Sequence, residues 1–188
     1  MELTYRFEEA LVYTTRLHAN QRRKSTDVPY ISHLMSTAAL VLEYGGDEDE
    51  AIAALLHDAV EDQGGMPILE EIRNKFGNRV ASIVEGCTDA FVTPKPPWLG
   101  RKEGYLQRLR IAPSDVRRVS LADKLHNARS LLASLRLEGS QAWQRFNGGR
   151  EGTLWYYQAL VDIFRETNND AMTDELIRVV AAIQAIAV

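Results

Sequence analysis

Apolar residues recur along most of the chain at the three- and four-residue spacing that is typical of amphipathic helices. Neither strict alternation nor an Asn-Gly turn between apolar runs indicates a pair of strands. The periodic segments predict helices over about 3–19, 31–44, 47–62, 67–77, 79–90, 101–110, 114–137, 151–165 and 172–187. The pattern therefore predicts an all-α fold.

Polar segments with glycine or proline separate these helices. Asp47 followed by Glu50 indicates a capping box at the start of the third helix, and Pro67 suits the first position of the fourth. Segment 91–100, FVTPKPPWLG, holds three prolines and is expected to be non-helical, and 138–150 is expected to be a loop. No internal repeat or long linker divides the chain. We therefore expect residues 1–188 to form a single domain, a compact helical bundle.

Composition narrows the class of protein. The 188 residues are 45% hydrophobic and 26% charged, an ordinary globular composition. Lys and Arg number 22 against 26 Asp and Glu, and the net charge of −4 disfavours a nucleic-acid partner held by phosphate contacts. There is no signal-peptide pattern, and no apolar run approaches the roughly 20 residues of a membrane span. We expect a cytoplasmic protein with no membrane partner, and the sequence leaves the oligomeric state open.

Segment 55–62, LLHDAVED, is the most informative part of the chain. On a continuous helix with about 100° between residues, its apolar side chains occupy one arc. The complementary arc holds His57, Asp58, Glu61 and Asp62. A lone His-Asp pair on a helix is more often part of a solvated polar face. Carboxylates this close repel one another unless a cation compensates, so a metal site is the alternative to test against the rest of the chain.

Two other segments supply further ligand types. His33 opens the second helix, and Asp123 lies on a polar face of the helix over 114–137. Taken singly, His33 could be a helix cap, Asp123 a surface charge and Asn127 a core hydrogen-bonding residue. Two histidines and two aspartates together suit Mn²⁺, Fe²⁺ or Zn²⁺. Cys87 is the single cysteine, which excludes a thiolate cluster.

The order of His33, His57-Asp58 and Asp123 resembles the metal-binding signature of the HD superfamily of phosphohydrolases. Four stretches more closely resemble the hydrolase domain of RelA/SpoT-type alarmone enzymes: QRRK at 21–24, PYISH at 29–33, HDAVED at 57–62 and LADKLHN at 121–127. The resemblance covers about residues 3–160. It implies an HD-type fold and, since the length leaves no room for a synthetase domain, a stand-alone small alarmone hydrolase.

The resemblance also implies a role for each matched residue. The metal ligands are His33, His57, Asp58 and Asp123, with Mn²⁺ the usual ion of the family. Glu61 and Asp62 match the acidic pair that handles the attacking water and its protons. Substrate contacts are implied for Arg23, Lys24, Ser25, Tyr30, Lys102, Tyr105, Asn127 and Ser130. Two positions depart from the long enzymes: Ser120, where lysine is common, and Gln63, where threonine is common.

The expected activity is metal-dependent hydrolysis of the 3′-pyrophosphate of ppGpp or pppGpp, by attack at its outer bridge, to give GDP or GTP and pyrophosphate. The partner is then a small-molecule nucleotide. A related hydrolase for an adenosine alarmone or a phosphorylated dinucleotide cofactor would keep the same metal site. A non-catalytic nucleotide-binding module is disfavoured by Glu61 and Asp62, and a helical scaffold without metal is the remaining alternative.

Overall fold

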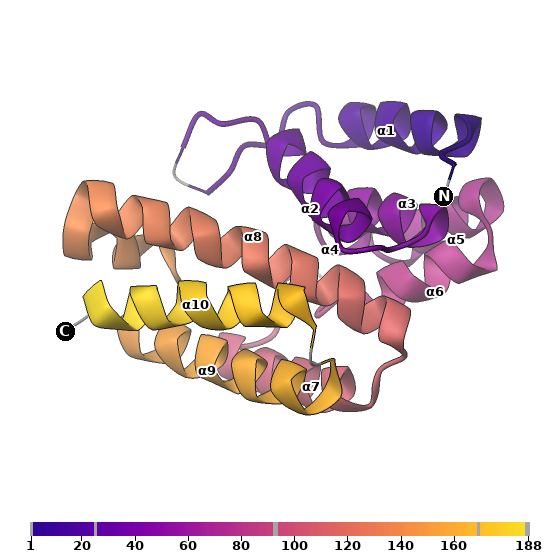
Figure 1. Ribbon diagram of the computed structural model, residues 1–188. Coiled ribbons are helices and arrows are strands. Elements are labelled where there is room, and N and C mark those ends of the chain that lie inside the picture. The colour runs from indigo at the N-terminus through magenta and orange to yellow at the C-terminus, as the bar shows by residue number, and fades with distance from the viewer. Residues whose placement is uncertain (1, 25, 92–93, 169, 187–188) are drawn as a thin grey trace.

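The long helix α8 (Ser114–Glu138) lies between two groups of helices in this computed structural model, which describes residues 2–24, 26–91, 94–168 and 170–186 (Figure 1). Helices α2, α3 and α6 pack on one side of α8, and α10 packs on the other. The remaining elements complete these two groups. Their bounds are α1 (Tyr5–Leu17), α2 (Ile31–Glu43), α3 (Glu48–Leu56), α4 (Ala59–Gln63), α5 (Met66–Phe76), α6 (Asn78–Cys87), α7 (Trp98–Ile111), the 3₁₀ helix η1 (Gly139–Arg145), α9 (Gly149–Thr167) and α10 (Ala171–Ile186).

The predicted all-α class is confirmed. Across the described residues no strand forms, and Arg22 and Pro29 make a single isolated β-bridge. None of the described helices is both long and apolar enough to cross a membrane.

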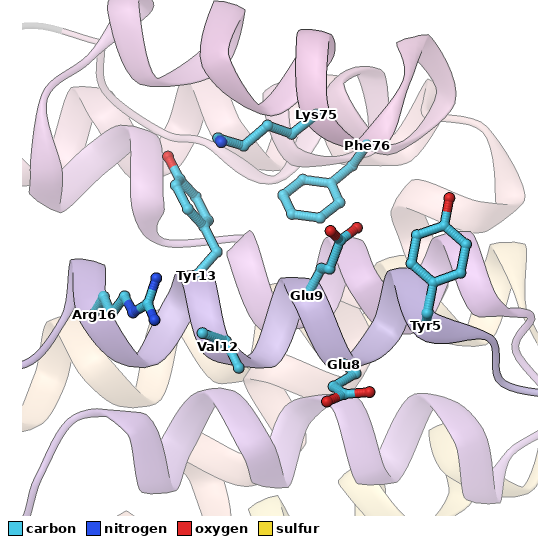
Figure 2. Close-up of a pocket in the computed structure, with 8 residues that line it drawn as sticks. All are labelled: Tyr5, Glu8, Glu9, Val12, Tyr13, Arg16, Lys75 and Phe76. Carbon is cyan, nitrogen blue, oxygen red and sulfur yellow. The ribbon is translucent and has the colours of Figure 1, made fainter.

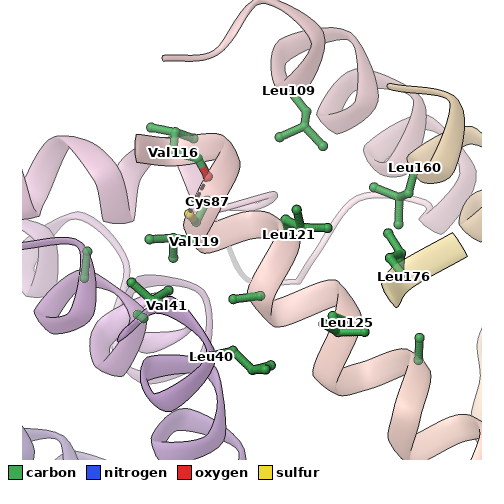
Figure 3. Close-up of a cluster of buried hydrophobic side chains, with 14 of the residues drawn as sticks. Leu40, Val41, Cys87, Leu109, Val116, Val119, Leu121, Leu125, Leu160 and Leu176 are labelled. Atoms are coloured by element: carbon green, nitrogen blue, oxygen red, sulfur yellow. Dashed lines mark hydrogen bonds between the residues drawn. The ribbon is translucent and has the colours of Figure 1, made fainter. Parts of the chain in front are cut away.

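Apolar side chains from both groups of helices meet around α8 (Figure 3). Leu121 and Leu125 lie four residues apart, so they share one face of α8, and both are fully buried. Burying each such side chain is favourable by about 1.5–3 kcal/mol. Asp123 lies between them in the sequence and projects from a different side of the helix, so burial of the two leucines fixes where its carboxylate points.

The predicted capping box at the start of α3 is confirmed. The backbone N–H of Glu50 donates to Asp47 Oδ1 at 3.0 Å, and the backbone N–H of Asp47 donates to Glu50 Oε2 at 2.8 Å. Gly45 follows α2 with φ of 79°, a conformation that favours glycine and ends the helix as expected.

The expected continuous helix over 47–62 is wrong. Helix α3 ends at Leu56 and α4 begins at Ala59, with His57 and Asp58 in the turn between them. The reason is a side chain: His57 Nδ1 donates to the carbonyl oxygen of Ala54 at 2.7 Å. A continuous helix would pair that oxygen with the backbone N–H of Asp58.

Other boundaries also differ from the prediction. Helix α6 ends at Cys87 rather than at residue 90, and part of the expected loop 138–150 forms η1. Segment 91–100 is not wholly irregular, because α7 begins at Trp98. Pro97 directly precedes the helix, where a missing backbone N–H is harmless since the first N–H groups of a helix have no partner within it.

Gly86 allows α6 to approach α8 closely. A Cβ atom at Gly86 would lie 2.8 and 2.9 Å from the two Cγ atoms of Val116. We expect Gly86→Ala to lower the free energy of unfolding by about 1–3 kcal/mol, as overpacking commonly does. The control is Gly104→Ala in α7, where a Cβ would be 3.6 Å from the flexible end of Arg108. Urea unfolding measures both, and equal effects of the two substitutions would contradict the close contact.

Candidate metal centre

Three separate parts of the chain bring the four predicted metal ligands together. His33 lies in the first turn of α2, His57 and Asp58 lie between α3 and α4, and Asp123 lies within α8. His33 Nε2 is 3.2 Å from Asp123 Oδ1 and 3.6 Å from Asp58 Oδ2. His57 Nε2 is 3.1 Å from Asp58 Oδ2 and 3.6 Å from Asp123 Oδ1. Two ring nitrogens and two carboxylates therefore converge on one small volume.

The Nε2 atoms of His33 and His57 are buried, and neither has a hydrogen-bond partner among the described residues. Such atoms are costly to leave unpaired. Ligand atoms about 2.1 Å from a shared ion are separated by about 3.0–3.5 Å, close to the spacings found here. His33, His57 and Asp58 offer ligand atoms within 4.8 Å of one another, and Asp123 Oδ1 reaches the same two nitrogens. These residues fit a divalent metal ion.

The second nitrogen of each ring is held by a different kind of partner. His57 Nδ1 donates to the backbone carbonyl of Ala54, whereas His33 Nδ1 lies 2.7 Å from Nδ1 of another imidazole, that of His126. Burial works to lower the pKa of His57, but Asp58 and Asp123 outweigh it and raise that pKa well above 6.5. For His33, burial dominates and lowers the pKa. Burial and the neighbouring charges lower the pKa of His126 to about 4.

Hydrogen bonds fix both carboxylates. Tyr30 donates its hydroxyl to Asp58 Oδ2 at 2.6 Å. Asn127 Nδ2 and Lys124 Nζ donate to the two oxygens of Asp123, each at 2.5 Å. Burial opposes ionisation, yet His57 beside Asp58 and the ammonium of Lys124 beside Asp123 lower the pKa of both carboxyl groups. Both side chains are therefore ionised at neutral pH, the form that binds a metal.

Glu61 and Asp62 lie on α4, directly after the ligand turn. Lys95 Nζ donates to Glu61 Oε1 at 2.7 Å and to Asp62 Oδ1 at 3.1 Å. Gln21 Nε2 donates to Asp62 Oδ2 at 2.8 Å, and Gln63 Nε2 in turn donates to Gln21 Oε1 at 2.5 Å. Burial raises the pKa of Glu61, with a further rise from Asp89 and Asp58 that Lys95 opposes. A carboxyl group of raised pKa is suited to accepting and returning a proton near neutral pH.

Three of the predicted substrate contacts, Tyr30, Asn127 and Arg23, lie beside the candidate metal centre, and Lys24 lies on the same loop as Arg23. The Arg23 guanidinium donates to Asn127 Oδ1 at 2.7 Å and lies 5.5 Å above the ring of Tyr30. Lys24 Nζ donates to Asn147 Oδ1 at 3.0 Å. The loop beside them forms an open cavity of about 460 Å³, lined by Arg22, Arg23, Lys24, Thr26 and Asp27.

Lys102 and Tyr105 on α7 are not brought into this group. Lys102 Nζ donates to Asp89 Oδ2 at 2.6 Å, so its charge is paired. Tyr105 is buried, and its hydroxyl donates to Ser120 Oγ at 2.9 Å. In this conformation the two side chains link α7 to Asp89 and Ser120, and the Tyr105 ring lies 5.0 Å from the ammonium of Lys124, which binds Asp123.

Two serines complete the predicted set. Ser130 is partly buried, and its hydroxyl donates to the backbone carbonyl of His126 at 3.0 Å, one turn earlier on α8. Ser25 lies outside the described residues.

A separate cavity of about 540 Å³ lies between α1 and α5 (Figure 2). Its lining combines Glu8, Glu9, Arg16 and Lys75 with the rings of Tyr5, Tyr13 and Phe76 and with Val12. None of the predicted site residues takes part in it.

Sequence reasoning missed several residues that contact the site, among them Lys95, Gln21, Asp89, Lys124 and His126. Gln21 belongs to the QRRK stretch, so the resemblance carried a signal for it. Lys95 is the single basic residue within FVTPKPPWLG, a weaker signal. Asp89 pairs with Arg101 and Lys102 on the next helix, and the sequence on either side of Asp89 gives no sign of these ion pairs.

A family model described as "HD domain" matches residues 10–154, more than half of the chain. The chain belongs to the HD domain family. This family is metal-dependent, in agreement with the donor set of His33, His57, Asp58 and Asp123.

Two curated relatives of this HD domain protein carry the name guanosine-3′,5′-bis(diphosphate) 3′-pyrophosphohydrolase MESH1. The Xenopus tropicalis protein is 39% identical over 126 residues, 65% of this chain and 68% of its own length. The human protein is 37% identical over 126 residues, again 65% of this chain and 68% of its own length. A probable enzyme of the same activity from Synechocystis is 39% identical over 125 residues, 65% of this chain but 16% of that much longer protein.

Two solved structures extend the similarity over more of the chain. One, described as a metazoan orthologue of SpoT that hydrolyses ppGpp and plays a role in starvation responses, matches with a TM-score of 0.79 and 26% identity, covering 95% of this chain and 96% of that one. The Listeria monocytogenes protein lmo0812 matches with a TM-score of 0.71 and 29% identity over 80% of this chain and 97% of its own. The fold is therefore the HD-domain fold.

Asp89 is expected to stabilise the protein in a pH-dependent manner. It is 4% exposed and accepts hydrogen bonds from Arg101 and Lys102, each at 2.6 Å. Burial works to raise its pKa, but Lys102, a hydrogen bond with Glu61 and Arg101 together lower it to about 2. Asp89→Asn should lower the free energy of unfolding by about 2 kcal/mol at pH 7. Since the pKa is depressed, this difference is present above about pH 4 and fades as the pH falls toward 2.

Urea unfolding of the two proteins between pH 7 and pH 2 measures the difference. The exposed Glu103→Gln on α7 is the control and should change little at any pH. A difference between wild type and Asp89→Asn that stays constant down to pH 2 would show that the carboxylate charge is not what stabilises the fold.

Proposed function

We propose that residues 1–188 form one metal-dependent hydrolase domain that removes the 3′-pyrophosphate from guanosine alarmones such as ppGpp, acting in the cytoplasm on a small nucleotide. The observation that carries the proposal is the cluster of two unpartnered histidine nitrogens and two carboxylates, with Glu61 and Asp62 on the following helix. Relatives named as 3′-pyrophosphohydrolases support the choice of substrate.

In this proposal His33, His57, Asp58 and Asp123 hold the ion, and Mn²⁺ is the ion we expect. A bound divalent ion lowers the pKa of water and offsets negative charge on phosphoryl oxygens. Tyr30, Asn127 and Lys124 keep the two carboxylates in place through the hydrogen bonds described above.

Glu61 and Asp62 handle the protons of the attacking water in the proposed reaction. Gln21 and Lys95 each hold one oxygen of Asp62 and so set its orientation. Burial raises the pKa of Glu61, which suits this carboxylate to accepting a proton from the attacking water. A substrate phosphate that drew the ammonium of Lys95 away would raise that pKa further, since Lys95 lowers it.

The products decide which bond breaks. Release of intact pyrophosphate and GDP requires cleavage between the ribose 3′ oxygen and the adjacent phosphorus. The oxygen of water then joins that phosphorus, and the 3′ oxygen leaves with a proton as a hydroxyl. Attack at the outer bridge between the two phosphorus atoms, which we expected from the sequence, would release a single phosphate and is wrong for these products.

Phosphate binding is assigned to Arg23 and Lys24, on the loop that precedes α2. Arg23 and Lys24 bind amide oxygens of Asn127 and Asn147, so the positive charge of each remains uncompensated by those partners. Contacts to the nucleotide from Ser25, Tyr30, Asn127 and Ser130 belong to the same proposal. Lys102 and Tyr105 would contribute only if they left Asp89 and Ser120.

Incubation of the purified protein with Mn²⁺ and ppGpp should give GDP and pyrophosphate in equal amounts. The absence of turnover by protein shown to contain metal would contradict the proposal. Faster hydrolysis of an adenosine alarmone or of a phosphorylated dinucleotide cofactor would assign a different nucleotide to the same centre.

Glu61→Gln should reduce kcat by about 10²–10⁴-fold, because the amide cannot accept the proton. Its Mn²⁺ affinity and free energy of unfolding should match wild type, since Glu61 is not among the four ligands. Glu70→Gln on α5 changes an exposed carboxylate and serves as the control. Steady-state pyrophosphate release measures the effect, and full activity of Glu61→Gln would remove Glu61 from the mechanism.

A further inference from the structure

His126 lies directly behind one of the proposed metal ligands. Its Nδ1 is 2.7 Å from Nδ1 of His33, and the two rings are tilted by 37° with centroids 4.8 Å apart. His33 is fully buried, whereas His126 is half-buried on α8, three residues after Asp123. A side chain of the helix that supplies one proposed ligand thus contacts a second proposed ligand.

The short distance between the two nitrogens constrains their protons. A hydrogen bond between two Nδ1 atoms requires that one carries a proton and the other offers a lone pair. His33 Nε2 can bind a metal only through its own lone pair, so a neutral His33 that binds metal must carry its proton on Nδ1. His126 Nδ1 must then be the acceptor, with the proton of its ring on Nε2.

His57, the other histidine of the proposed metal site, has a different kind of partner at Nδ1. His57 Nδ1 contacts the carbonyl oxygen of Ala54, which can only accept a hydrogen bond, so the proton of His57 is fixed on Nδ1 by the backbone. An imidazole can either donate or accept at Nδ1. The tautomer of His33 therefore depends on a side chain, and its Nε2 could instead carry the proton toward Asp123, 3.2 Å away.

We propose that His126 is a positioning residue of the metal centre: it accepts a hydrogen bond from His33 Nδ1 and so keeps the Nε2 lone pair of His33 directed at the ion. The inference rests on the metal site of the proposed function and not on the identity of the nucleotide. Partners of this kind, one step removed from the metal, typically contribute about 10–100-fold to metal affinity.

His126→Asn and His126→Leu form a matched pair of variants. Asparagine and leucine have nearly the same size and shape, but only asparagine offers an oxygen in place of Nδ1. We expect His126→Leu to raise the Kd for Mn²⁺ by about 10–100-fold and His126→Asn to stay close to wild type. Free Mn²⁺ measured by electron paramagnetic resonance gives the Kd without any substrate. Equal Kd values for the two variants would overturn the proposal, since a loss of packing alone would affect both alike.

A spectroscopic measurement on the wild-type protein makes the test independent of how the variants fold. The chain has four histidines, so their ring nitrogens can be resolved by long-range ¹H–¹⁵N correlation in protein loaded with diamagnetic Zn²⁺. We expect a protonated Nδ1 in His33 and a protonated Nε2 in His126. A His126 protonated on Nδ1 would make it the donor and overturn the proposal.

These measurements separate the inference from the proposed function. Wild-type protein that binds no divalent ion would contradict the metal site itself. Wild-type protein that binds Mn²⁺ tightly, together with unchanged binding by His126→Leu, would contradict only the role of His126.

Discussion

A single hydrogen bond, from the ring of His57 to the carbonyl oxygen of Ala54, connects the fold to the chemistry of this HD domain protein. It occupies the acceptor that would have continued α3, so the helix stops at Leu56 and restarts at Ala59. It also keeps a proton on His57 Nδ1, so that Nε2, which faces Asp58 and Asp123, is the ring nitrogen left to bind a metal. Glu61 and Asp62 lie on α4, the helix that begins directly after this turn.

Helix α8 buries both apolar side chains and a charged carboxylate. Its apolar face, with Leu121 and Leu125, lies in the core, yet it also buries the carboxylate of Asp123. An isolated buried charge is costly unless it is paired and hydrogen-bonded. Lys124 and Asn127 follow Asp123 on the same helix, and both donate hydrogen bonds to its carboxylate, which offsets the cost of burying its charge. The carboxylate is thereby held rigidly at the place where it meets two histidine rings from other elements.

The sequence predicted what depends on local periodicity and on motif order. The helical class and the convergence of His33, His57, Asp58 and Asp123 follow from apolar spacing and from the resemblance to HD hydrolases. Periodicity did not detect the break at His57, because a side chain rather than a helix-breaking residue type ends α3. It also extended the non-helical segment over Trp98, since Pro97 interrupts a helix but is well tolerated directly before one.

Contacts between distant segments were beyond such reasoning. Lys95 reaches Glu61 across 34 residues, and Arg23 reaches Asn127 across 104. Neither pair has a periodic or local signal, since each depends on how a loop lies against helices already packed. Gln63 illustrates the same limit: the sequence marks it as a departure from related enzymes, but only the fold shows that it supports Gln21 and, through it, Asp62.

The basic residues around the centre differ in how much charge they offer to a phosphate. Arg101 and Lys102 share the carboxylate of Asp89, so that group as a whole carries one positive charge instead of two. Arg23 and Lys24 are held by the neutral amide oxygens of Asn127 and Asn147, which orient their side chains without cancelling the charge. Lys95 and Lys124 are likewise paired with carboxylates, those of Glu61, Asp62 and Asp123. A protein of net charge −4 can therefore attract a polyanion locally through Arg23 and Lys24, whose amide partners leave their charge available.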